Sequence, residues 1–384
     1  MMTKTRRIMI VAGESSGDTH AAKLVRAMRE AEPETDFQFF GAAGPKMRSE
    51  SVEAVVNSDG LAVVGLAEIA ADLPLFLKAF SKLKQAAIEH QPDALILVDF
   101  PDFNLKLAKT LKRKGYRIIY YISPQLWAWR KYRVRTIIKY VDLMLTILPF
   151  EKQWYVQNGF EKVEYVGSPL AREVHAEVSK DDFCRKHDLD PTTPIIALLP
   201  GSREKEISRV FPIMCAAADK MAAKDKNIQF VVALGSDQSS GSTIKVADGL
   251  NIQIVGGETY DALNVADAAA ITSGTATLEA GIIGTPMAVV YKTSALNYRL
   301  FEPMIDVPHY GLINLIAGKR VAKELIQAEF TPRSLSEELL RLLEPDVNAA
   351  MRAELKIAAD KLGHGGASKR AAEAILNLID QEPS

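Results

Sequence analysis

Leu198-Leu199-Pro200-Gly201-Ser202-Arg203-Glu204 and, further along, Thr272-Ser273-Gly274-Thr275-Ala276-Thr277-Leu278-Glu279 are the two stretches that decide the fold. In each, an apolar run typical of a buried parallel strand (residues 195–199 and 268–271) ends at small polar residues and passes into a helix pattern. Both stretches therefore predict a strand-to-helix turn. Gly201 and Gly274 let the backbone approach a ligand closely, and the first N–H groups of each following helix are unpaired donors at a positive dipole end.

Two such turns in one half of a chain indicate a site for a diphosphate. Arg203 adds a forked cation, and Glu279 is placed to accept hydrogen bonds from a pair of sugar or ribose hydroxyls. The alternative is two ordinary turns with a surface arginine and a surface glutamate. The expected donor-binding residues are Gly201, Ser202, Arg203, Ser273, Gly274, Thr275 and Glu279.

Length and composition limit the possible classes of protein. A chain of 384 residues suggests two domains, and a formal net charge of −1 predicts no nucleic-acid partner. Only Cys184 and Cys215 are present, which fits a reducing compartment. The histidines are scattered without ligand spacing, so no metal site is expected. No secretory signal is evident, and no apolar stretch approaches the roughly 18 residues that a membrane span needs.

The first half of the chain begins with the same strand-then-helix pattern. Residues 7–12 read as a strand, followed by Gly13-Glu14-Ser15-Ser16-Gly17-Asp18 and a helix. The next strand ends in glycines, where a dinucleotide-binding fold has an acidic residue, so NAD is not expected. Gly13 to Gly17 fits the G-x-S-x-G elbow of hydrolases, but no His or Asp can be assigned to Ser15 as a catalytic partner.

A further strand, residues 94–98, runs into Asp99-Phe100-Pro101-Asp102. Pro101 and Asp102 open a helix, which places Asp102 at the carboxyl edge of the sheet as a candidate active carboxylate. Asp99 in the same turn is its rival, and an aspartate that only stabilises the helix dipole is the alternative. Downstream, Trp127 and Trp129 lie two residues apart, so we expect their loop to line a cleft.

Residues 61–80 carry more apolar side chains than one amphipathic helix needs for one core face. They form either a buried helix hairpin or an exposed patch for a lipid or bilayer surface. Basic residues at 106–114 and 130–139 would also hold such a patch to anionic headgroups. The candidate patch residues are Val63, Val64, Leu66, Ile69, Leu73, Leu75, Phe76 and Phe80.

The second half repeats the β-then-α alternation after a polar linker around residues 167–194. Alternation of this kind predicts parallel sheets whose two faces are both covered by helices. We therefore predict an α/β fold of two Rossmann-like parallel-sheet domains that face each other across a cleft. The expected parts are residues 1–170, 171–345 and the C-terminal helices 346–384, which pack back on the first domain or exchange between the chains of a homodimer.

The chain strongly resembles the lipid-A-disaccharide synthase family of Gram-negative bacteria. This resemblance implies an inverting glycosyltransferase of the GT-B fold that needs no metal or cofactor. It implies transfer from UDP-2,3-diacylglucosamine to 2,3-diacylglucosamine 1-phosphate (lipid X) through a β-1′,6 bond, with release of UDP. It also implies a cytoplasmic protein bound peripherally to the inner face of the cytoplasmic membrane. The motifs that carry it are residues 11–18, 43–47, 101–104, 123–124, 127–130, 148–151, 198–203, 273–279 and 314–318.

Matched residue by residue, the resemblance implies that Asp102 is the general base and that Glu14 is also important for activity. It adds Asn314 to the donor-binding residues and assigns residues 61–80 to the lipid acyl chains. Ser15 stands where the family usually has Ala, which argues against a nucleophilic serine. From the residues alone, two other functions stay open: a UDP-sugar 2-epimerase on the same frame, and a nucleotide-binding docking module without enzymatic activity.

Overall fold

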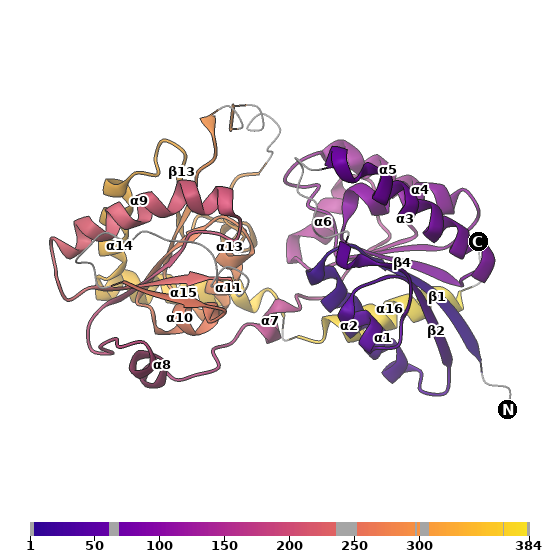
Figure 1. Ribbon diagram of the computed structural model, residues 1–384, viewed down its shortest axis with the longest axis horizontal. Coiled ribbons are helices and arrows are strands. Elements are labelled where there is room, and N and C mark those ends of the chain that lie inside the picture. Colours follow the sequence, from indigo (N-terminus) through magenta and orange to yellow (C-terminus); the bar gives the residue numbers. More distant parts are fainter. Residues whose placement is uncertain are drawn as a thin grey trace. The chain divides into compact units, whose positions relative to one another are not determined.

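The computed structural model of the chain describes residues 4–60, 69–235, 252–295, 298–299, 307–363 and 365–381. The chain divides into two compact units, Met1–Pro169 with Gly365–Ser384, and Leu170–His364 (Figure 1). Each unit holds a parallel sheet with helices on both faces. The predicted α/β fold with two parallel-sheet domains is confirmed.

The sheet of the first unit has seven parallel strands in the order β3-β2-β1-β4-β5-β6-β7. The chain moves outward in one direction from β1 to β3 and in the other from β4 to β7. The switch point, where such sheets bind ligands at their carboxyl edge, therefore lies between β1 and β4. The strands are β1 (Thr5–Ala12), β2 (Asp36–Ala43), β3 (Glu53–Asn57), β4 (Ala94–Val98), β5 (Ile118–Tyr121), β6 (Leu143–Thr146) and β7 (Val163–Tyr165).

Alternating side chains of β1 supply the core on both faces of this sheet. Ile8 and Ile10 pack on the side of α1 and α16, whereas Met9 and Val11 pack on the side of α3, α4 and α5 (Figure 1). A central strand buried on both faces needs this continuous apolar run. The helices of the unit are α1 (Ser15–Ala31), α2 (Pro45–Ser49), α3 (Ile69–His90), α4 (Pro101–Lys112), α5 (Val134–Tyr140), α6 (Pro149–Gln157) and α16 (Ala367–Asp380).

The second unit repeats this topology with six parallel strands in the order β10-β9-β8-β11-β12-β13, so its switch point lies between β8 and β11. Its strands are β8 (Ile195–Leu199), β9 (Gln229–Leu234), β10 (Ile252–Gly256), β11 (Ala268–Thr272), β12 (Met287–Tyr291) and β13 (Lys323–Ile326). Its helices include α7 (Leu170–Glu173), α8 (Lys180–Lys186), α9 (Glu204–Ala222), α10 (Thr259–Val265), α11 (Thr275–Ile283), α13 (Leu312–Ala317), α14 (Pro332–Leu342) and α15 (Pro345–Asp360).

The C-terminal segment 346–384 is split between the two units. Helix α15 packs on α11 and α13 of the second unit, and α16 packs on α1 of the first. Arg117 anchors the end of α16 by donating from Nη1 to the carbonyls of Leu378 (2.7 Å) and Ile379 (3.0 Å). These bonds satisfy carbonyl groups that the last turn of a helix otherwise leaves unpaired.

The linker between the two units is shorter than the polar segment 167–194 from which it was predicted. Within it, α8 buries Phe183 and Cys184 and packs against α10, so this helix belongs to the second unit. Two apolar side chains on a helix rich in charged residues are enough to dock it. Among the residues described above, we find no helix with the length and apolar character to cross a bilayer.

Candidate active site

The loops that follow β1 and β4 meet at the switch point of the first sheet. Glu14 occupies the position before α1 and is exposed, while Asp99 and Phe100 connect β4 to α4, whose second residue is Asp102. Neighbouring parallel strands end at the same edge of a sheet, so the carboxylates of Glu14, Asp99 and Asp102 gather there. The structure thus brings the predicted carboxylates of the first domain to one place.

The turn after β4 has an uncommon backbone conformation. Asp99 and Phe100 are both left-handed, with φ of 47° and 50°, although neither is glycine. The Asp99 carbonyl accepts hydrogen bonds from the Tyr120 hydroxyl (2.6 Å) and from Asn104 Nδ2 (2.8 Å). Side chains from β5 and α4 therefore hold this strained turn in place, and strain of this kind gathers at functional sites.

The Asp99 carboxyl group has a perturbed protonation equilibrium. Burial raises its pKa to about 6, and the negative charge of Glu14 acts in the same direction. The backbone N–H of Phe100 offsets part of this rise. A carboxyl group of this kind changes its charge close to neutral pH.

Asp102 lies in a different environment, because two arginines hold its carboxylate. Arg130 Nη1 donates to Oδ1 at 3.2 Å, and Arg133 Nη2 donates to the same oxygen. Arg130 is itself fixed by stacking over the ring of Trp129 at 4.2 Å. The sequence placed both arginines in a basic surface run and gave no sign that they converge on Asp102.

The loop with the two tryptophans is corrected in part. Trp129 is half-buried beneath Arg130, but Trp127 is buried and its Nε1 donates to Glu151 at 3.0 Å. Glu151 also accepts from the Leu148 backbone at 3.1 Å and so caps α6. Burial raises the pKa of Glu151 to about 7. Trp127 therefore belongs to the core and orients the loop, because its only polar atom has a buried partner.

On the second unit, the loop after β8 carries Gly201 and Arg203. Gly201 has a φ of 114°, which strongly favours glycine. Arg203 is the residue before α9, and its side chain is 82% exposed, with Nη1 only 3.5 Å from Glu206 Oε1. Because the side chain is exposed and its ion pair with Glu206 is long, the guanidinium can turn toward an anion at the start of α9. Ser202 lies between them in the same loop.

The loop after β11 starts a second helix at the same edge of the sheet. Gly274 caps α11 with a φ of 155°, and Thr275 is the first helical residue. Ser273 is occupied inside the protein, since its N–H donates to Val290 and its hydroxyl donates to the Tyr310 carbonyl (2.7 Å). The Thr277 N–H donates to the Gly274 carbonyl at 3.2 Å, so the donors suited to a ligand at the start of α11 are the N–H groups of Thr275 and Ala276.

Glu279 lies one turn into α11 and is half-buried. Its Oε1 accepts a hydrogen bond from the Tyr260 hydroxyl at 3.1 Å. Burial raises the pKa of Glu279, and the bond from Tyr260 partly offsets this effect. The bond from Tyr260 fixes the orientation of the carboxylate, and its other oxygen, Oε2, is suited to accept a hydrogen bond from a ligand hydroxyl.

Asn314, which the family resemblance adds to the donor-binding residues, has a side chain that bonds inside the protein. Its side chain is fully buried and uses all four hydrogen-bonding positions within the protein. Nδ2 donates to Ala322 and Glu324, and Oδ1 accepts from the backbone of Val321 and Ala322, each at 2.7–2.9 Å. Glu324 also accepts from the N–H groups of Tyr310 and Gly311 at 3.0 and 2.9 Å. Asn314 thus shapes the loop beside Ser273, and Glu324 is a partner that the sequence did not reveal.

The structure describes only some of the residues that were predicted to form the apolar patch. Leu75 and Leu77 of α3 are 44% and 61% exposed. Phe76 and Phe80 are half-buried instead, and both rings contact Phe103. Ile69 and Leu73 belong to α3, while Val63, Val64 and Leu66 lie outside the described residues.

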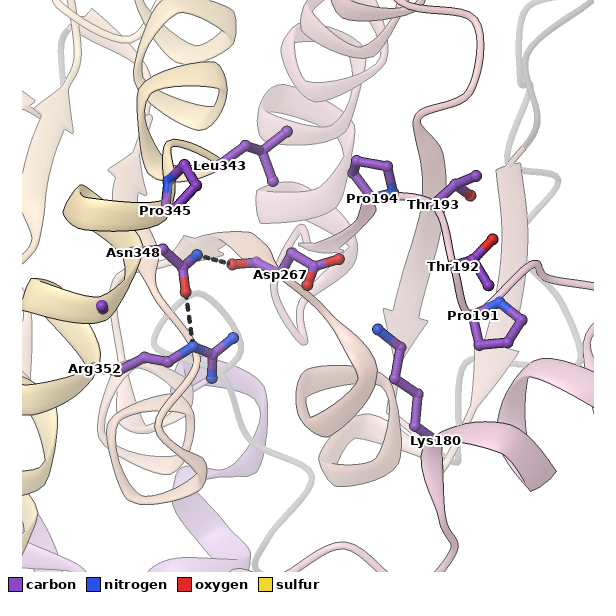
Figure 2. A pocket seen from close by; sticks show the side chains of 11 residues that line it. Lys180, Pro191, Thr192, Thr193, Pro194, Asp267, Leu343, Pro345, Asn348 and Arg352 are labelled. Atoms are coloured by element: carbon purple, nitrogen blue, oxygen red, sulfur yellow. Dashed lines mark hydrogen bonds between the residues drawn. The ribbon is translucent and has the colours of Figure 1, made fainter.

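A pocket of about 420 Å³ lies at the opposite edge of the second sheet, where β8 and β11 begin. Figure 2 shows Asn348 in this pocket, where its side chain donates to the Asp267 carbonyl and accepts from Arg352. The Asp267 carboxylate accepts the N–H of Ile195 at 2.9 Å. None of the predicted site residues lines this pocket. Within the described ranges, no group of three metal-binding side chains is present either.

Comparison with known proteins identifies relatives of the whole chain. Residues 8–379 match the family described as lipid-A-disaccharide synthetase. Proteins named lipid-A-disaccharide synthase include one from Geobacter sulfurreducens, 40% identical over 381 residues that cover 98% of each chain. One from Syntrophus aciditrophicus is 43% identical over 379 residues, again with 98% of each chain covered.

Solved structures with lower sequence identity share the fold. The glycotransferase of kitacinnamycin has a TM-score of 0.66 at 17% identity, covering 98% of this chain and 99% of the other. A UDP-GlcNAc 2-epimerase from Neisseria meningitidis, bound to UDP-GlcNAc, has a TM-score of 0.62 at 13% identity, covering 97% and 100%. At such identities the likeness concerns architecture alone.

Proposed function

The chain belongs to the lipid-A-disaccharide synthase family and is a glycosyltransferase, and from this premise we propose its substrates and the parts that its residues play. The donor is UDP-2,3-diacylglucosamine and the acceptor is 2,3-diacylglucosamine 1-phosphate (lipid X). The products are the β-1′,6-linked disaccharide 1-phosphate and UDP. The transfer inverts the configuration at C1 of the donor sugar.

One observation carries this proposal: each unit gathers its polar loops at the switch point of its sheet. The first unit gathers carboxylates and arginines there, and the second gathers glycine turns and the start of a helix. The first set fits the acceptor, which brings a hydroxyl that must lose a proton and a phosphate that needs cations. The second set fits the nucleotide diphosphate. We therefore assign the acceptor to the first unit and the donor to the second.

The donor site works through electrostatic stabilisation of the leaving group. As the bond from C1 to the diphosphate breaks, negative charge grows on the phosphate oxygens. The first N–H groups of α11 and the Arg203 guanidinium are donors suited to that charge, which makes a divalent ion unnecessary. Gly201 and Gly274 keep the backbone open at both turns, and Glu279 accepts from the ribose hydroxyls. Asn314 supports this site indirectly by fixing the loop that begins α13.

The acceptor site contains the carboxylates that remove the proton from the attacking hydroxyl. Glu14 and Asp102 are placed there together with Asp99. Three carboxylates can share the work: one acts as the base, and the others hold the substrate or the neighbouring arginines. The arginines at Asp102 provide the only described pair of guanidiniums that share a carboxylate at this edge of the first sheet.

The first unit also provides the contact with the inner, cytoplasmic face of the cytoplasmic membrane. Exposed Leu75 and Leu77 lie on α3, which packs against α4. Lys106 and Lys109 are exposed on α4. Leucine side chains that enter the lipid and lysines that meet anionic headgroups together favour peripheral binding. Such a position gives the site access to acylated substrates.

The test is the structure of the product formed from the two purified substrates. Proton NMR of the isolated disaccharide should show a β linkage from C1 to the 6-position of the acceptor. An α-linked product would contradict the inverting mechanism. Conversion of the donor to its C2 epimer, with no disaccharide, would instead support the epimerase that shares this fold.

A further inference from the structure

The loop after β2 presents an exposed lysine at the carboxyl edge of the first sheet. Lys46 lies in the motif of residues 43–47, just after the end of β2. Strand β2 pairs in parallel with β1, whose following loop bears Glu14. Resting on the proposed function, we propose that Lys46 binds the phosphate of the acceptor and that Thr19 positions its ammonium group. Lys46 is then a binding residue and Thr19 a positioning residue.

The Lys46 ammonium group is oriented by a neutral partner. Its Nζ donates to Thr19 Oγ1 at 2.9 Å, and that hydroxyl donates to the Ser15 carbonyl at 3.0 Å. Two hydrogen bonds therefore link the ammonium to the residue that follows Glu14. An ammonium group carries three N–H donors, so two of them remain for a phosphate.

A buried aspartate fixes the loop that carries Lys46. Asp18 of α1 is 3% exposed. Its carboxylate accepts the N–H groups of Gly44, Lys46 and Met47 at 2.8–3.1 Å. A β-carbon at Gly44 would lie 2.5 Å from Asp18 Cγ, so this close approach requires glycine. Helix α2 also packs on α1 (Figure 1).

The same aspartate ties this loop to the one before it. The Asp18 N–H donates to the Glu14 carbonyl at 2.8 Å. The loops after β1 and β2 are therefore joined through Asp18, and they hold the Glu14 carboxylate and the Lys46 ammonium in fixed backbone positions. A charge on a fixed backbone loses less conformational entropy when a ligand binds.

The arginines on the other side of the switch point differ from Lys46 in their partners. Arg130 and Arg133 both donate to the Asp102 carboxylate. The described residues provide no carboxylate within ion-pairing distance of Lys46, which donates to a hydroxyl instead. A phosphate can therefore bind Lys46 without breaking an ion pair, whereas it has to compete with Asp102 for the arginines.

The position of Lys46 suits an acceptor whose hydroxyl reacts at the switch point. The acceptor carries its phosphate and its attacking hydroxyl on one sugar ring. Neighbouring strands lie about 4.8 Å apart, a spacing of the order of the width of such a ring. A hydroxyl between β1 and β4 therefore leaves the phosphate within reach of the loop after β2. The phosphate does not react, so Lys46 binds it alike in the ground state and the transition state, and its loss should raise KM rather than lower kcat.

The experiment measures kcat and KM in neutral detergent, with UDP-2,3-diacylglucosamine and either lipid X or its analogue without the phosphate. The variants are Lys46→Met, Lys46→Arg, Thr19→Val and Arg133→Met. Lys162→Met is the matched control, since Lys162 is exposed just before β7, at the amino edge of the same sheet. Co-sedimentation of Lys46→Met with phosphatidylglycerol vesicles distinguishes the acceptor phosphate from a lipid headgroup.

Lys46→Met should raise KM for lipid X about tenfold or more and leave kcat nearly unchanged, because a charge-assisted hydrogen bond is lost. It should leave the reaction of the phosphate-free acceptor as in wild type, which also shows that the variant is folded. Lys46→Arg should keep the preference for lipid X, since it keeps the charge. Thr19→Val should raise KM for lipid X alone, and by less, because the ammonium loses only its orientation. Lys162→Met, and the vesicle binding of Lys46→Met, should match wild type.

The inference is overturned if Lys46→Met leaves KM for lipid X unchanged or affects both acceptors equally. A preference for lipid X that is lost in Arg133→Met and kept in Lys46→Met assigns the phosphate to the arginines instead. Weaker vesicle binding with an unchanged preference assigns Lys46 to lipid headgroups. A failure of the proposed function looks different, because wild type then forms no disaccharide from either acceptor.

Discussion

A β-carbon at Gly13 would lie 2.3 Å from Cδ1 of Phe100, so the loop after β1 and the turn after β4 touch with no room for a side chain between them. The Phe100 ring has little space to retreat, because it stacks on Phe103 with 5.4 Å between ring centroids. This contact joins the loop that bears Glu14 to the turn that bears Asp99. The spacing of the carboxylates therefore depends on the absence of a side chain at Gly13.

Gly13→Ala should lower the free energy of unfolding of the first unit by about 1–3 kcal/mol, because the added methyl group overpacks this contact. It should also lower kcat, since Phe100 precedes α4 and moves the carboxylates when it shifts. Gly17→Ala is the matched control, because its β-carbon would lie 3.6 Å from Ala12 Cβ in ordinary contact. Urea unfolding and turnover of both variants check the prediction. Equal behaviour of the two would refute it.

Arg203→Ala should raise the Kd for UDP about tenfold or more, since it removes a charge-assisted hydrogen bond to the diphosphate. Arg209→Ala is the control, because Arg209 is exposed on the same helix, α9, more than one turn after Arg203. Titration calorimetry with UDP measures both. If the two variants bind UDP alike, Arg203 does not contact the diphosphate.

Glu279→Gln should weaken the binding of UDP more than the binding of 2′,3′-dideoxy-UDP. The Glu279 carboxylate accepts from Tyr260 on one oxygen, and in our proposal the other oxygen accepts from the ribose hydroxyls, which the analogue lacks. Calorimetry with the two nucleotides isolates this contact. An equal loss of affinity for both would show that Glu279 only shapes the pocket.

The strands could be predicted from the sequence because apolar runs ended in Gly or small polar residues. The runs at residues 94–98 and 195–199 coincide with β4 and β8. Periodicity of this kind is a local property, and local signals suffice for a parallel sheet. The positions of Glu14, Asp99 and Asp102 at one edge then follow from topology.

The partners of the site residues could not be predicted in the same way. Phe100 does not favour a left-handed backbone, and the bonds from Tyr120 and Asn104 that hold this turn come from parts of the chain outside it. The family resemblance placed Asn314 among the donor-binding residues, but no sequence pattern showed that its side chain is buried and accepts from the backbone of Val321 and Ala322. Such contacts join residues that are distant in sequence or depend on loop shape, and no periodic pattern encodes them.

Glu151→Gln should remove a pH-dependent loss of stability. Burial raises the pKa of Glu151 from its ordinary 4.5 to about 7, so the folded protein keeps a proton that the unfolded chain releases between these values. The contribution of Glu151 to the free energy of unfolding is therefore full below pH 4.5 and falls as pH rises to about 7. Wild type should lose more stability than the variant between pH 5 and 8, by at most about 3 kcal/mol. Urea unfolding at both pH values checks this, and parallel losses would mean that Glu151 is ionised in the fold.

Replacing Leu75 and Leu77 together by Ser should weaken binding to phosphatidylglycerol vesicles about thirtyfold, because each leucine contributes roughly 1 kcal/mol when its exposed part enters lipid. Ile357→Ser is the control, since Ile357 is 58% exposed on α15 of the second unit. Co-sedimentation with vesicles measures the change. If the double variant sediments like wild type, the exposed leucines are not the membrane contact.

The most direct test of the assigned transfer is release of UDP from UDP-2,3-diacylglucosamine by the purified protein, with and without lipid X and with EDTA present throughout. Our account predicts release that depends on the acceptor and survives the chelator, because Arg203 and the start of α11 stabilise the leaving diphosphate. Release at the same rate without the acceptor, or no release at all, would contradict the transfer.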